Sequence, residues 1–236
     1  MKFGLIAAGL GSRLVSEGVA TPKPLVRVGG ECLLERMLRI FLDNGADSIS
    51  VITNEEMTEV HRFLKAQELP VPFQVVIKST PSSLHSFYEL RKFLQGGKVC
   101  LTTVDPIFSE QEFGDYIRTF AADEESDALM GVTDYIDDEK PLYVKVEEPG
   151  MKITGYANQA YEGCNYVSGG IYCFNERALS LLPQALEKGI SRMRGFQQYI
   201  VDAGLNVKAH AFSKVIDIDH AEDIRKAELF VNELVK

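Results

Sequence analysis

The chain has 236 residues, of which 45% are hydrophobic and 25% are charged, and its formal net charge is -9 at pH 7. This composition is typical of a soluble globular protein and excludes a disordered or collagen-like chain, while the acidic balance argues against a nucleic-acid partner, whose phosphates require basic patches. The apolar runs are too short to cross a bilayer and the N-terminus lacks a signal-peptide pattern, so we expect a cytoplasmic protein without a membrane partner.

The first 105 residues alternate between apolar strand patterns and amphipathic helix patterns. Strands are predicted at residues 2–7, 48–53, 73–77 and 98–102, and helices at 32–44, 55–67 and 82–94. In the helix at 32–44, apolar residues recur at spacings of three and four, and the pattern stops at Asn44-Gly45. Such strand–helix alternation predicts a parallel sheet covered by helices.

After residue 105 the strands follow one another more closely. A helix is predicted at 111–122, strands at 127–133, 142–146, 152–156 and 166–174, helices at 176–182 and 193–203, a strand at 207–211 and a helix at 220–234. No linker and no internal repeat separates the halves. We therefore expect a single α/β domain over residues 1–236, Rossmann-like, with three α/β/α layers, a mixed but mainly parallel sheet, and an elaborated second half at 106–236.

A glycine loop, Gly9-Leu-Gly11, directly follows the first predicted strand, at the edge where open α/β sheets bind ligands. It is not a Rossmann fingerprint, because Leu14 stands where glycine or alanine is needed, and it is not a Walker A loop, because Ser12-Arg13 follows. Its backbone N–H groups can still contact phosphate oxygens, although glycines also occur in ordinary turns. Residues 1–30 carry a net charge of +3 against -12 for the rest, which suits a polyanionic ligand.

Lys23 lies between two prolines in the segment Thr21-Pro-Lys-Pro-Leu25. Each proline ring fixes the backbone angle φ, and prolines often do no more than stiffen a loop. Because these two flank a single lysine near a glycine loop, the pattern favours an ammonium group that is pre-positioned to bind phosphate.

Together these motifs resemble the signature of the sugar-1-phosphate nucleotidyltransferase family, within the NTP-transferase superfamily. The matching segments are Leu5-x-Ala-Ala-Gly-x-Gly-Ser-Arg-Leu14, Pro22-Lys-Pro-Leu25, and Gly30 with Leu33-Leu-Glu-Arg36. The resemblance extends along the chain and implies that residues 1–105 form the nucleotide-binding half. The residues that it implies for nucleotide binding here are Ala7, Ala8, Gly9, Gly11, Ser12 and Arg13. It also implies that Arg13 and Lys23 are catalytic, because they neutralise phosphate charge at the reacting centre.

The base pocket is implied at Thr80, Ser82 and Ser83, within Thr80-Pro-Ser-Ser-Leu84. This segment lacks the glycine that the family has there, so the identity of the base stays open. Ser82 is equally well placed to cap the predicted helix at 82–94.

Acidic residues near two strand ends match the family's ligands for Mg²⁺. Asp105 follows the strand at 98–102, where the family usually has Gly-Asp, although an aspartate there can also form a simple turn. Asp217 and Asp219 precede the last predicted helix, and strand alternation would place both on one face, where their repulsion favours a bound cation. The resemblance implies Asp105 and Asp217 as ligands, with Asp219 as a third ligand or a helix cap. Mg²⁺ is therefore the expected cofactor.

The second half, 106–236, is expected to bind the acceptor and to supply the second metal ligand. The segment Val167-Ser-Gly-Gly-Ile-Tyr172 resembles an Asn-x-Gly-Ile-Tyr strand of the family. It implies that Ser168 and Gly169 contact the acceptor. Lys145 and Asn158 are further candidates for acceptor contacts.

The implied reaction is Mg²⁺-dependent transfer of a nucleoside monophosphate from a nucleoside triphosphate (NTP) to a sugar-1-phosphate, with release of pyrophosphate. The attacking phosphate is already an anion at pH 7, so no general base is required. The expected partners are an NTP and a phosphorylated small-molecule acceptor, and we expect a monomer or homodimer. No hexapeptide repeat follows, so a second acyltransferase domain is not expected.

Three alternatives remain open at this point. A phosphocholine cytidylyltransferase would need an aromatic cage for its quaternary ammonium, for which the candidates are Tyr156, Tyr161, Tyr166 and Tyr172. A non-catalytic nucleotide-binding module is compatible with the altered segments at 80–83 and 104–105, but the presence of Lys23 and both acids opposes it. The third alternative is transfer to a different acceptor, such as a cofactor precursor.

We predict that Asp105→Asn and Lys23→Ala each lower turnover at least about tenfold, because each removes charge compensation at the transferred phosphate. The fold is expected to persist in both variants. Steady-state rates of pyrophosphate release measure the effect, and near-normal rates in both variants would contradict the assignment.

Overall fold

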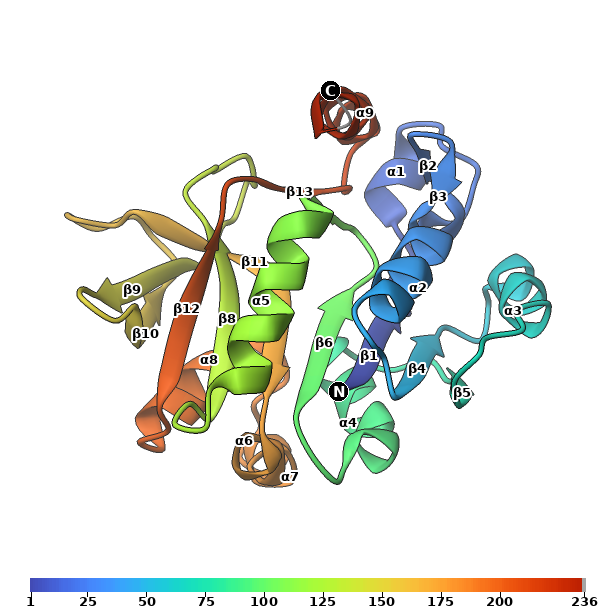
Figure 1. Ribbon diagram of the computed structural model, residues 1–236. Helices are drawn as coiled ribbons and strands as arrows, with labels where there is room; N and C mark the ends of the chain where they lie inside the picture. The colour runs from blue at the N-terminus through green and yellow to red at the C-terminus, as the bar shows by residue number, and fades with distance from the viewer. Residues whose placement is uncertain (235–236) are drawn as a thin grey trace.

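A nine-stranded sheet forms the centre of the computed structural model, which describes residues 1–234 (Figure 1). The strand order is β5-β4-β1-β6-β11-β8-β12-β10-β9. In chain order these strands are β1 (Lys2–Ala7), β4 (Ser48–Thr53), β5 (Phe73–Ile77), β6 (Val99–Thr103), β8 (Ala128–Thr133), β9 (Tyr143–Glu147), β10 (Lys152–Ala157), β11 (Tyr166–Phe174) and β12 (Val207–Phe212). Two small sheets accompany the large one, and they pair β2 (Arg27–Val28) with β3 (Glu31–Cys32) and β7 (Pro106–Phe108) with β13 (Val215–Asp217).

The large sheet is mixed, and β10 and β11 are the strands that run against the other seven. The strands β5, β4, β1 and β6 are parallel neighbours, and β8 is parallel to β12. The expectation of a mixed, mainly parallel sheet is confirmed. As a result, the carboxyl ends of β1, β4 and β6 meet at one edge, where α/β sheets place their ligands.

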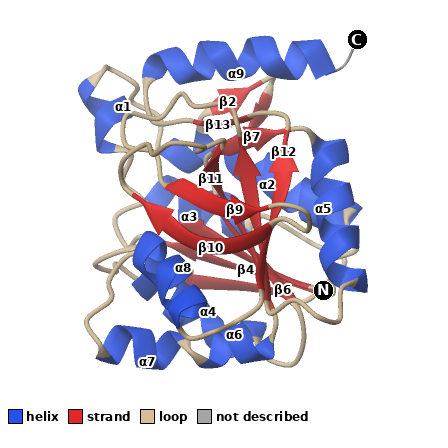
Figure 2. Cartoon of the chain, turned by 90° about the vertical axis from the view of Figure 1, so that its left-hand side faces the viewer, coloured by secondary structure: helices blue, strands red, loops and turns tan. Residues whose placement is uncertain are grey.

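Helices cover both faces of this sheet (Figure 2). One face packs against α2 (Leu33–Asp43), α3 (Thr58–Lys65) and α5 (Glu110–Ala122), and the other against α4 (Ser83–Leu94), α6 (Glu176–Ser180), α7 (Leu182–Glu187) and α8 (Met193–Asp202). Alternation along β1 supplies both cores, because Phe3 and Leu5 join the first and Ile6 the second. This arrangement confirms the three-layer α/β/α architecture.

Stacked aromatic rings fix α2 and α5 against the sheet. The ring centroids of Phe3 and Phe41 are 4.6 Å apart, and those of Phe108 and Phe113 are 5.0 Å apart. All four side chains are essentially inaccessible to solvent. Rigid packing at this face supports the loops that follow β1 and β6, where the candidate site lies.

The predicted elements are found close to their expected bounds, with α7 as an additional helix and several short elements added. The helix expected at 176–182 ends at Ser180, and α7 starts at Leu182, next to Pro183, which has no N–H to donate to a continuing helix. The additional elements are α1 (Ser12–Ser16), the 3₁₀ turn η1 (Lys23–Leu25), β2, β3, β7 and β13. These are too short to produce a hydrophobic period.

The last helix, α9 (Ala221–Leu234), lies along the edge of the molecule where the carboxyl ends of β1 and β6 are found (Figures 1 and 2). No helix within residues 1–234 has both the length and the apolarity that a membrane span requires.

His210 on β12 provides a test of the packing beneath α5. Its ring makes edge contacts with Tyr116 and Phe212, at centroid distances of 5.4 Å and 5.7 Å, and burial lowers the pKa of His210 in the folded state. The unfolded chain therefore binds more protons as the pH falls below about 6.5, and folding stability decreases in that range.

We expect His210→Gln to flatten this pH dependence, because glutamine cannot be protonated. The measurement is the free energy of unfolding in urea at pH 7 and at pH 5. An equal loss of stability between the two pH values in both proteins would contradict this account.

Candidate active site

A cavity of about 570 Å³ opens at the carboxyl ends of β1, β4 and β6. Most of the residues that the sequence assigned to the nucleotide line this one space, together with the catalytic candidate Lys23 and the metal candidates Asp105 and Asp219: Ala8, Gly9, Gly11, Ser12, Arg13, Thr80, Ser82 and Ser83. Ala7 does not, because it is the last residue of β1 and its side chain is completely buried in the core. The cavity lining therefore gives the prediction for Ala7 no support, and its buried side chain supports the loop from beneath.

The glycine loop is held against the lysine segment by close contact. Gly11 has a φ of +62°, and a Cβ built on it would lie 2.9 Å from Cβ of Lys23. A side chain at position 11 would therefore both strain the backbone and displace Lys23. Gly9, by contrast, faces open space. The loop is thus packed on one side and accessible on the other, as an anion-binding loop requires.

Lys23 is buried and contacts two carboxylates. Its Nζ donates hydrogen bonds to Oδ2 of Asp105 and, at 2.7 Å, to Oδ1 of Asp219. Burial alone would lower the pKa of Lys23, but the two carboxylates outweigh it and raise that pKa above its ordinary value. Burial opposes ionisation of Asp105 as well, yet the adjacent ammonium lowers the pKa of its carboxyl. Both partners are therefore charged.

Arg13 extends this charge network toward the solvent. Its Nη1 donates to Oδ2 of Asp219 at 2.6 Å, and the side chain is about half exposed (48%). Asp219 consequently binds two cations that the sequence assigned to the phosphates. An incoming triphosphate would compete with Asp219 for these cations.

Asp217 differs from its two acidic neighbours because it has no cation of its own. Its Oδ1 is buried and has no hydrogen-bond partner within residues 1–234. Burial, reinforced by the Asp105 carboxylate, raises the pKa of Asp217 well above its ordinary value. Asp217 and Asp219 line the same two cavities while Ile216 and Ile218 are buried, as the expected alternation requires, although β13 itself ends at Asp217 and Asp219 follows it.

The donor atoms at this position fit a hard cation such as Mg²⁺. Asp105, Asp217 and Asp219 offer only carboxylate oxygens, and the unpartnered Oδ1 of Asp217 is the kind of atom that a metal would satisfy. In the described part of the chain, no three ligand side chains converge into a complete metal site. Mg²⁺ commonly uses one or two carboxylates and takes its remaining ligands from phosphate and water, and the carboxylates here suit that mode.

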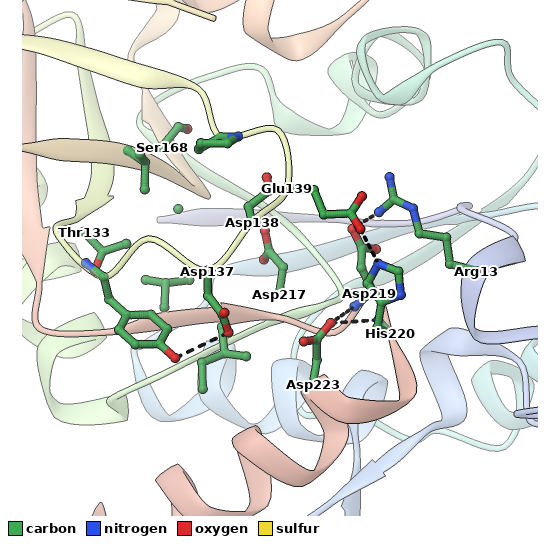
Figure 3. A pocket seen from close by; sticks show the side chains of 16 residues that line it. Arg13, Thr133, Asp137, Asp138, Glu139, Ser168, Asp217, Asp219, His220 and Asp223 are labelled. Atoms are coloured by element: carbon green, nitrogen blue, oxygen red, sulfur yellow. Dashed lines mark hydrogen bonds and ion pairs between the residues drawn. The ribbon is translucent and has the colours of Figure 1, made fainter. Parts of the chain in front are cut away.

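Two further cavities adjoin the nucleotide cavity on the side of β11. One is lined by Asp138, Ser168, Gly169, Asp217 and Asp219, as Figure 3 shows for the labelled residues. The other has a volume of about 460 Å³ and shares the lining residues Ser82, Ser83 and Asp105 with the nucleotide cavity. Ser168 faces both, and its Oγ donates to Oε1 of Gln197 at 3.2 Å.

The other acceptor candidates are dispersed. Asn158 lines a separate cavity, and its Oδ1 accepts a hydrogen bond from Nη1 of Arg194 at 2.9 Å. Lys145 lines neither of these cavities, and its Nζ lies 5.3 Å from the ring centroid of Tyr161. Its assignment to the acceptor has no support in this geometry.

The four tyrosines do not form a cage. Tyr172 lines the 460 Å³ cavity, whereas Tyr156 is partly buried and its buried hydroxyl has no partner in the described residues. The Tyr161 hydroxyl donates to the Val144 carbonyl, and Tyr166 lines a separate cavity.

Some lining residues were missed from the sequence. Asn54, Ser86 and Thr103 line the nucleotide cavity, and Arg192 and Arg194 line the 460 Å³ cavity. Asn54 directly follows β4, just as the glycine loop follows β1, so its position was a usable signal. Ser82 serves in both expected ways, since it caps α4 by accepting from the N–H of His85 and also lines the cavity.

Comparison with known proteins gives a family match over nearly the whole chain. The family model described as "Nucleotidyl transferase" matches residues 4–233. Among solved structures, the inositol-1-phosphate CTP transferase of T. maritima superposes with a TM-score of 0.81 at 21% identity, covering 100% of this chain and 96% of that one. A Bacillus anthracis protein described as a candidate glucose-1-phosphate thymidylyltransferase gives 0.85 at 20% identity, with 99% and 96% covered. At these identities the structures establish the fold.

Two curated relatives match over part of the chain. A bifunctional IPC transferase and DIPP synthase of Thermococcus kodakarensis is 32% identical over 108 residues, which are 44% of this chain and 23% of that protein. A 2-aminoethylphosphonate cytidylyltransferase of Lancefieldella rimae is 27% identical over 115 residues, 45% of this chain and 44% of that protein. The matches thus span less than half the length of these relatives.

The buried ion pair predicts a specific stability pattern. Lys23→Met leaves the Asp105 carboxylate buried beside no cation, and breaking such a pair costs about 3 kcal/mol or more. The double variant Lys23→Met/Asp105→Asn removes both charges and should recover part of that loss. We therefore expect Lys23→Ala to lower stability as well as turnover, which revises the expectation from sequence that this variant affects turnover alone.

The free energies of unfolding in urea of Lys23→Met, Asp105→Asn and the double variant measure these differences. The control is Arg118→Met, which removes an exposed pair with Asp115 and should cost less than about 1 kcal/mol. Equal stability of Lys23→Met and the control would contradict the role given to the buried pair.

Proposed function

Because this chain belongs to the nucleotidyl transferase family, we propose that it transfers a nucleoside monophosphate from an NTP to a phosphorylated small molecule and releases pyrophosphate. The observation that carries the proposal is the single cavity in which the glycine loop, Arg13, Lys23 and Asp105 converge. A second cavity adjoins it at Asp105, Asp217 and Asp219. Donor and acceptor can therefore meet beside the same carboxylates.

The proposed reaction is one displacement at the α-phosphorus of the NTP. A phosphate oxygen of the acceptor forms the new P–O bond, and the bond from the α-phosphorus to the oxygen that bridges to the β-phosphorus breaks. Pyrophosphate leaves with that electron pair. Both reactants are anions, and two unit charges about 4 Å apart repel by about 4 kcal/mol at an effective dielectric of 20. Charge neutralisation is therefore the main requirement of the site.

Lys23 and Arg13 meet this requirement from the donor side. Lys23 is fixed by Asp105 and Asp219, so its ammonium is already oriented before the NTP binds. Arg13 is partly exposed and can turn from Asp219 to the phosphates. A guanidinium in this position can contact two phosphate oxygens at once.

Mg²⁺ is the proposed cofactor, held by Asp105 and Asp217 with Asp219 close by. When bound, it would screen the phosphate charge and polarise the α-phosphate. The support is the all-oxygen donor set and the unpartnered Oδ1 of Asp217. The exposed position of Asp219 and its two cations make it the ligand most easily replaced by phosphate.

The proposed acceptor is a sugar-1-phosphate or a similar cyclic polyol phosphate, and the first candidate for the nucleotide is CTP. The support for CTP comes from the names of two relatives, an inositol-1-phosphate CTP transferase and a 2-aminoethylphosphonate cytidylyltransferase. A cavity of about 460 Å³ has ample room for a phosphorylated six-carbon ring.

A second candidate acceptor carries a positive charge, as phosphocholine and 2-aminoethylphosphonate do. The supporting observation is the run Asp137, Asp138 and Glu139 on the wall of the cavity in Figure 3. Asp137 is already paired with Lys226, but Asp138 lines both acceptor cavities and pairs with no cation among residues 1–234. A carboxylate in that position would attract an ammonium group.

The test is a matrix of nucleotides against acceptors, scored for pyrophosphate. ATP, CTP, GTP, UTP and dTTP are each combined with glucose-1-phosphate, inositol-1-phosphate, phosphocholine and 2-aminoethylphosphonate. We expect release only when the NTP, the acceptor and Mg²⁺ are all present, and EDTA should abolish it because the carboxylates then repel the phosphates.

Asp217→Asn tests the proposed metal ligand, because it keeps the size of the side chain and removes the charged carboxylate. It should lower the rate at least about a hundredfold without lowering the stability of the fold, because it also removes a buried carboxylate that Asp105 repels. Absence of pyrophosphate with every pair, or release that does not depend on an acceptor, would overturn the proposal.

A further inference from the structure

We infer that Glu17 is a positioning residue that keeps the metal-binding carboxylates close to the glycine loop while the NTP binds, and this rests on the proposed nucleotidyl transfer. Glu17 directly follows α1, the short helix that begins where the glycine loop ends. It belongs to none of the segments that carry the family resemblance. The inference follows from its contacts with a segment 203 and 204 residues further along the chain.

Glu17 binds the start of α9 through both oxygens of its carboxylate. Its Oε2 accepts a hydrogen bond from the N–H of Ala221 at 2.7 Å, and its Oε1 lies 2.5 Å from Nδ1 of His220. Ala221 is the first residue of α9, where backbone N–H groups have no partner within the helix. A carboxylate also complements the positive end of the helix dipole. Glu17 thus connects α1 to the N-terminus of α9.

This contact adjoins the turn that carries the proposed metal ligand Asp219. The N–H groups of Asp219 and His220 both donate to Oδ2 of Asp223, at 3.1 Å and 2.7 Å (Figure 3). The N–H of Ile218 donates to the carbonyl oxygen of Asp105 at 3.2 Å. Together with the bond to Glu17, these interactions use four successive N–H groups of the turn. The turn is therefore well defined, and a contact at its end fixes where its carboxylate lies.

The helix α1 has few other attachments to the rest of the molecule. It has five residues, and Leu14 is the only one of them that is buried. A further attachment is Arg13, whose Nη1 donates to Oδ2 of Asp219. Glu17 and Arg13 thus both connect this end of the glycine loop to the segment where α9 begins.

These two connections differ in what NTP binding does to them. In the proposed reaction Arg13 turns from Asp219 to the phosphates, so its contact is lost when the site fills. Glu17 instead contacts a backbone N–H and an imidazole, and neither is proposed to bind phosphate or metal. Its side chain lines neither the nucleotide cavity nor the two cavities beside it. The Glu17 contact is therefore retained when the Arg13 contact is broken.

The expected consequence is a coupling between the metal and the nucleotide. The phosphates are proposed to bind the glycine loop and the metal to bind the carboxylates, so the affinity for both together depends on the spacing of these two parts. When Glu17 sets this spacing in advance, α1 does not have to be ordered on binding. Removal of Glu17 should consequently weaken nucleotide binding in the presence of metal, and much less in its absence.

The test is nucleotide binding with and without Mg²⁺, measured by isothermal titration calorimetry. The probe is the α,β-methylene analogue of the NTP that gives the fastest pyrophosphate release, because a CH₂ group in place of the bridging oxygen prevents that release. For Glu17→Ala we expect the Kd at saturating Mg²⁺ to rise at least about fivefold, a modest coupling, while the Kd in EDTA changes less than about twofold. In steady-state kinetics the KM of the NTP should rise and that of the acceptor should not.

Glu17→Gln is the conservative variant, because its carbonyl oxygen can still accept from the N–H of Ala221. It should restore most of the affinity that Glu17→Ala loses. The matched control is Glu222→Ala, which removes an exposed carboxylate from α9 that pairs with Arg225, makes the same change in net charge, and should leave both Kd values unchanged. The side chains of Glu17 and His220 are 36% and 32% exposed, so we expect Glu17→Ala to stay folded in the assay.

The outcomes separate the positioning role from the proposed function. If the wild-type protein is active and the Kd of Glu17→Ala is unchanged, or rises equally with Mg²⁺ and with EDTA, the positioning role is overturned and the proposed function stands. An equal loss in Glu222→Ala, or no recovery in Glu17→Gln, also overturns it, since net charge would then explain the effect. A wild-type protein that releases no pyrophosphate with any pair overturns the proposed function and this inference with it.

Discussion

The structure of the site depends on one buried ammonium group held between two carboxylates. Lys23 lies 82 residues from Asp105 and 196 residues from Asp219, and it contacts both. A buried charge without such partners would be too costly to keep ionised, so the three segments that carry these residues must pack together. The same requirement brings Gly11 against Lys23, because the lysine side chain occupies the space that a larger residue at 11 would need.

The sheet topology explains why the second acid reaches this position. The strands β7 and β13 pair antiparallel, with Asp217 opposite Pro106. Because Asp105 precedes Pro106, the pairing brings Asp217 beside Asp105 from the distant end of the chain. The reversed strand β11 then passes next to β6 and contributes Ser168 and Tyr172 to the adjacent cavity. Donor and acceptor sides are thus built on neighbouring strands of one sheet.

The first half of the molecule could be predicted from sequence because its signals are local. Strand periods, helix spacing and the glycine and proline motifs each report on a few adjacent residues, and they placed the glycine loop, Lys23 and Asp105 correctly around one cavity.

The second half depends on contacts between distant segments. The alternation proposed for Asp217 and Asp219 describes which side they share, but not that β13 is three residues long and pairs with the distant β7. Arg192 carries no motif, and only the folded arrangement shows that it lines the 460 Å³ cavity. Ala7 was assigned to the ligand because a motif does not distinguish a residue that contacts a ligand from one that supports the contact.

The long separation between Lys23 and Asp219 also has a consequence for the order of events during synthesis. The glycine loop and its cations are made early, whereas the carboxylate that binds both Lys23 and Arg13 emerges from the ribosome only after nearly 200 further residues. Until then, this part of the nascent chain presents positive charge that any cellular polyanion can bind. Synthesis of Asp219 therefore supplies an internal partner for that charge, with which a polyanionic ligand must then compete.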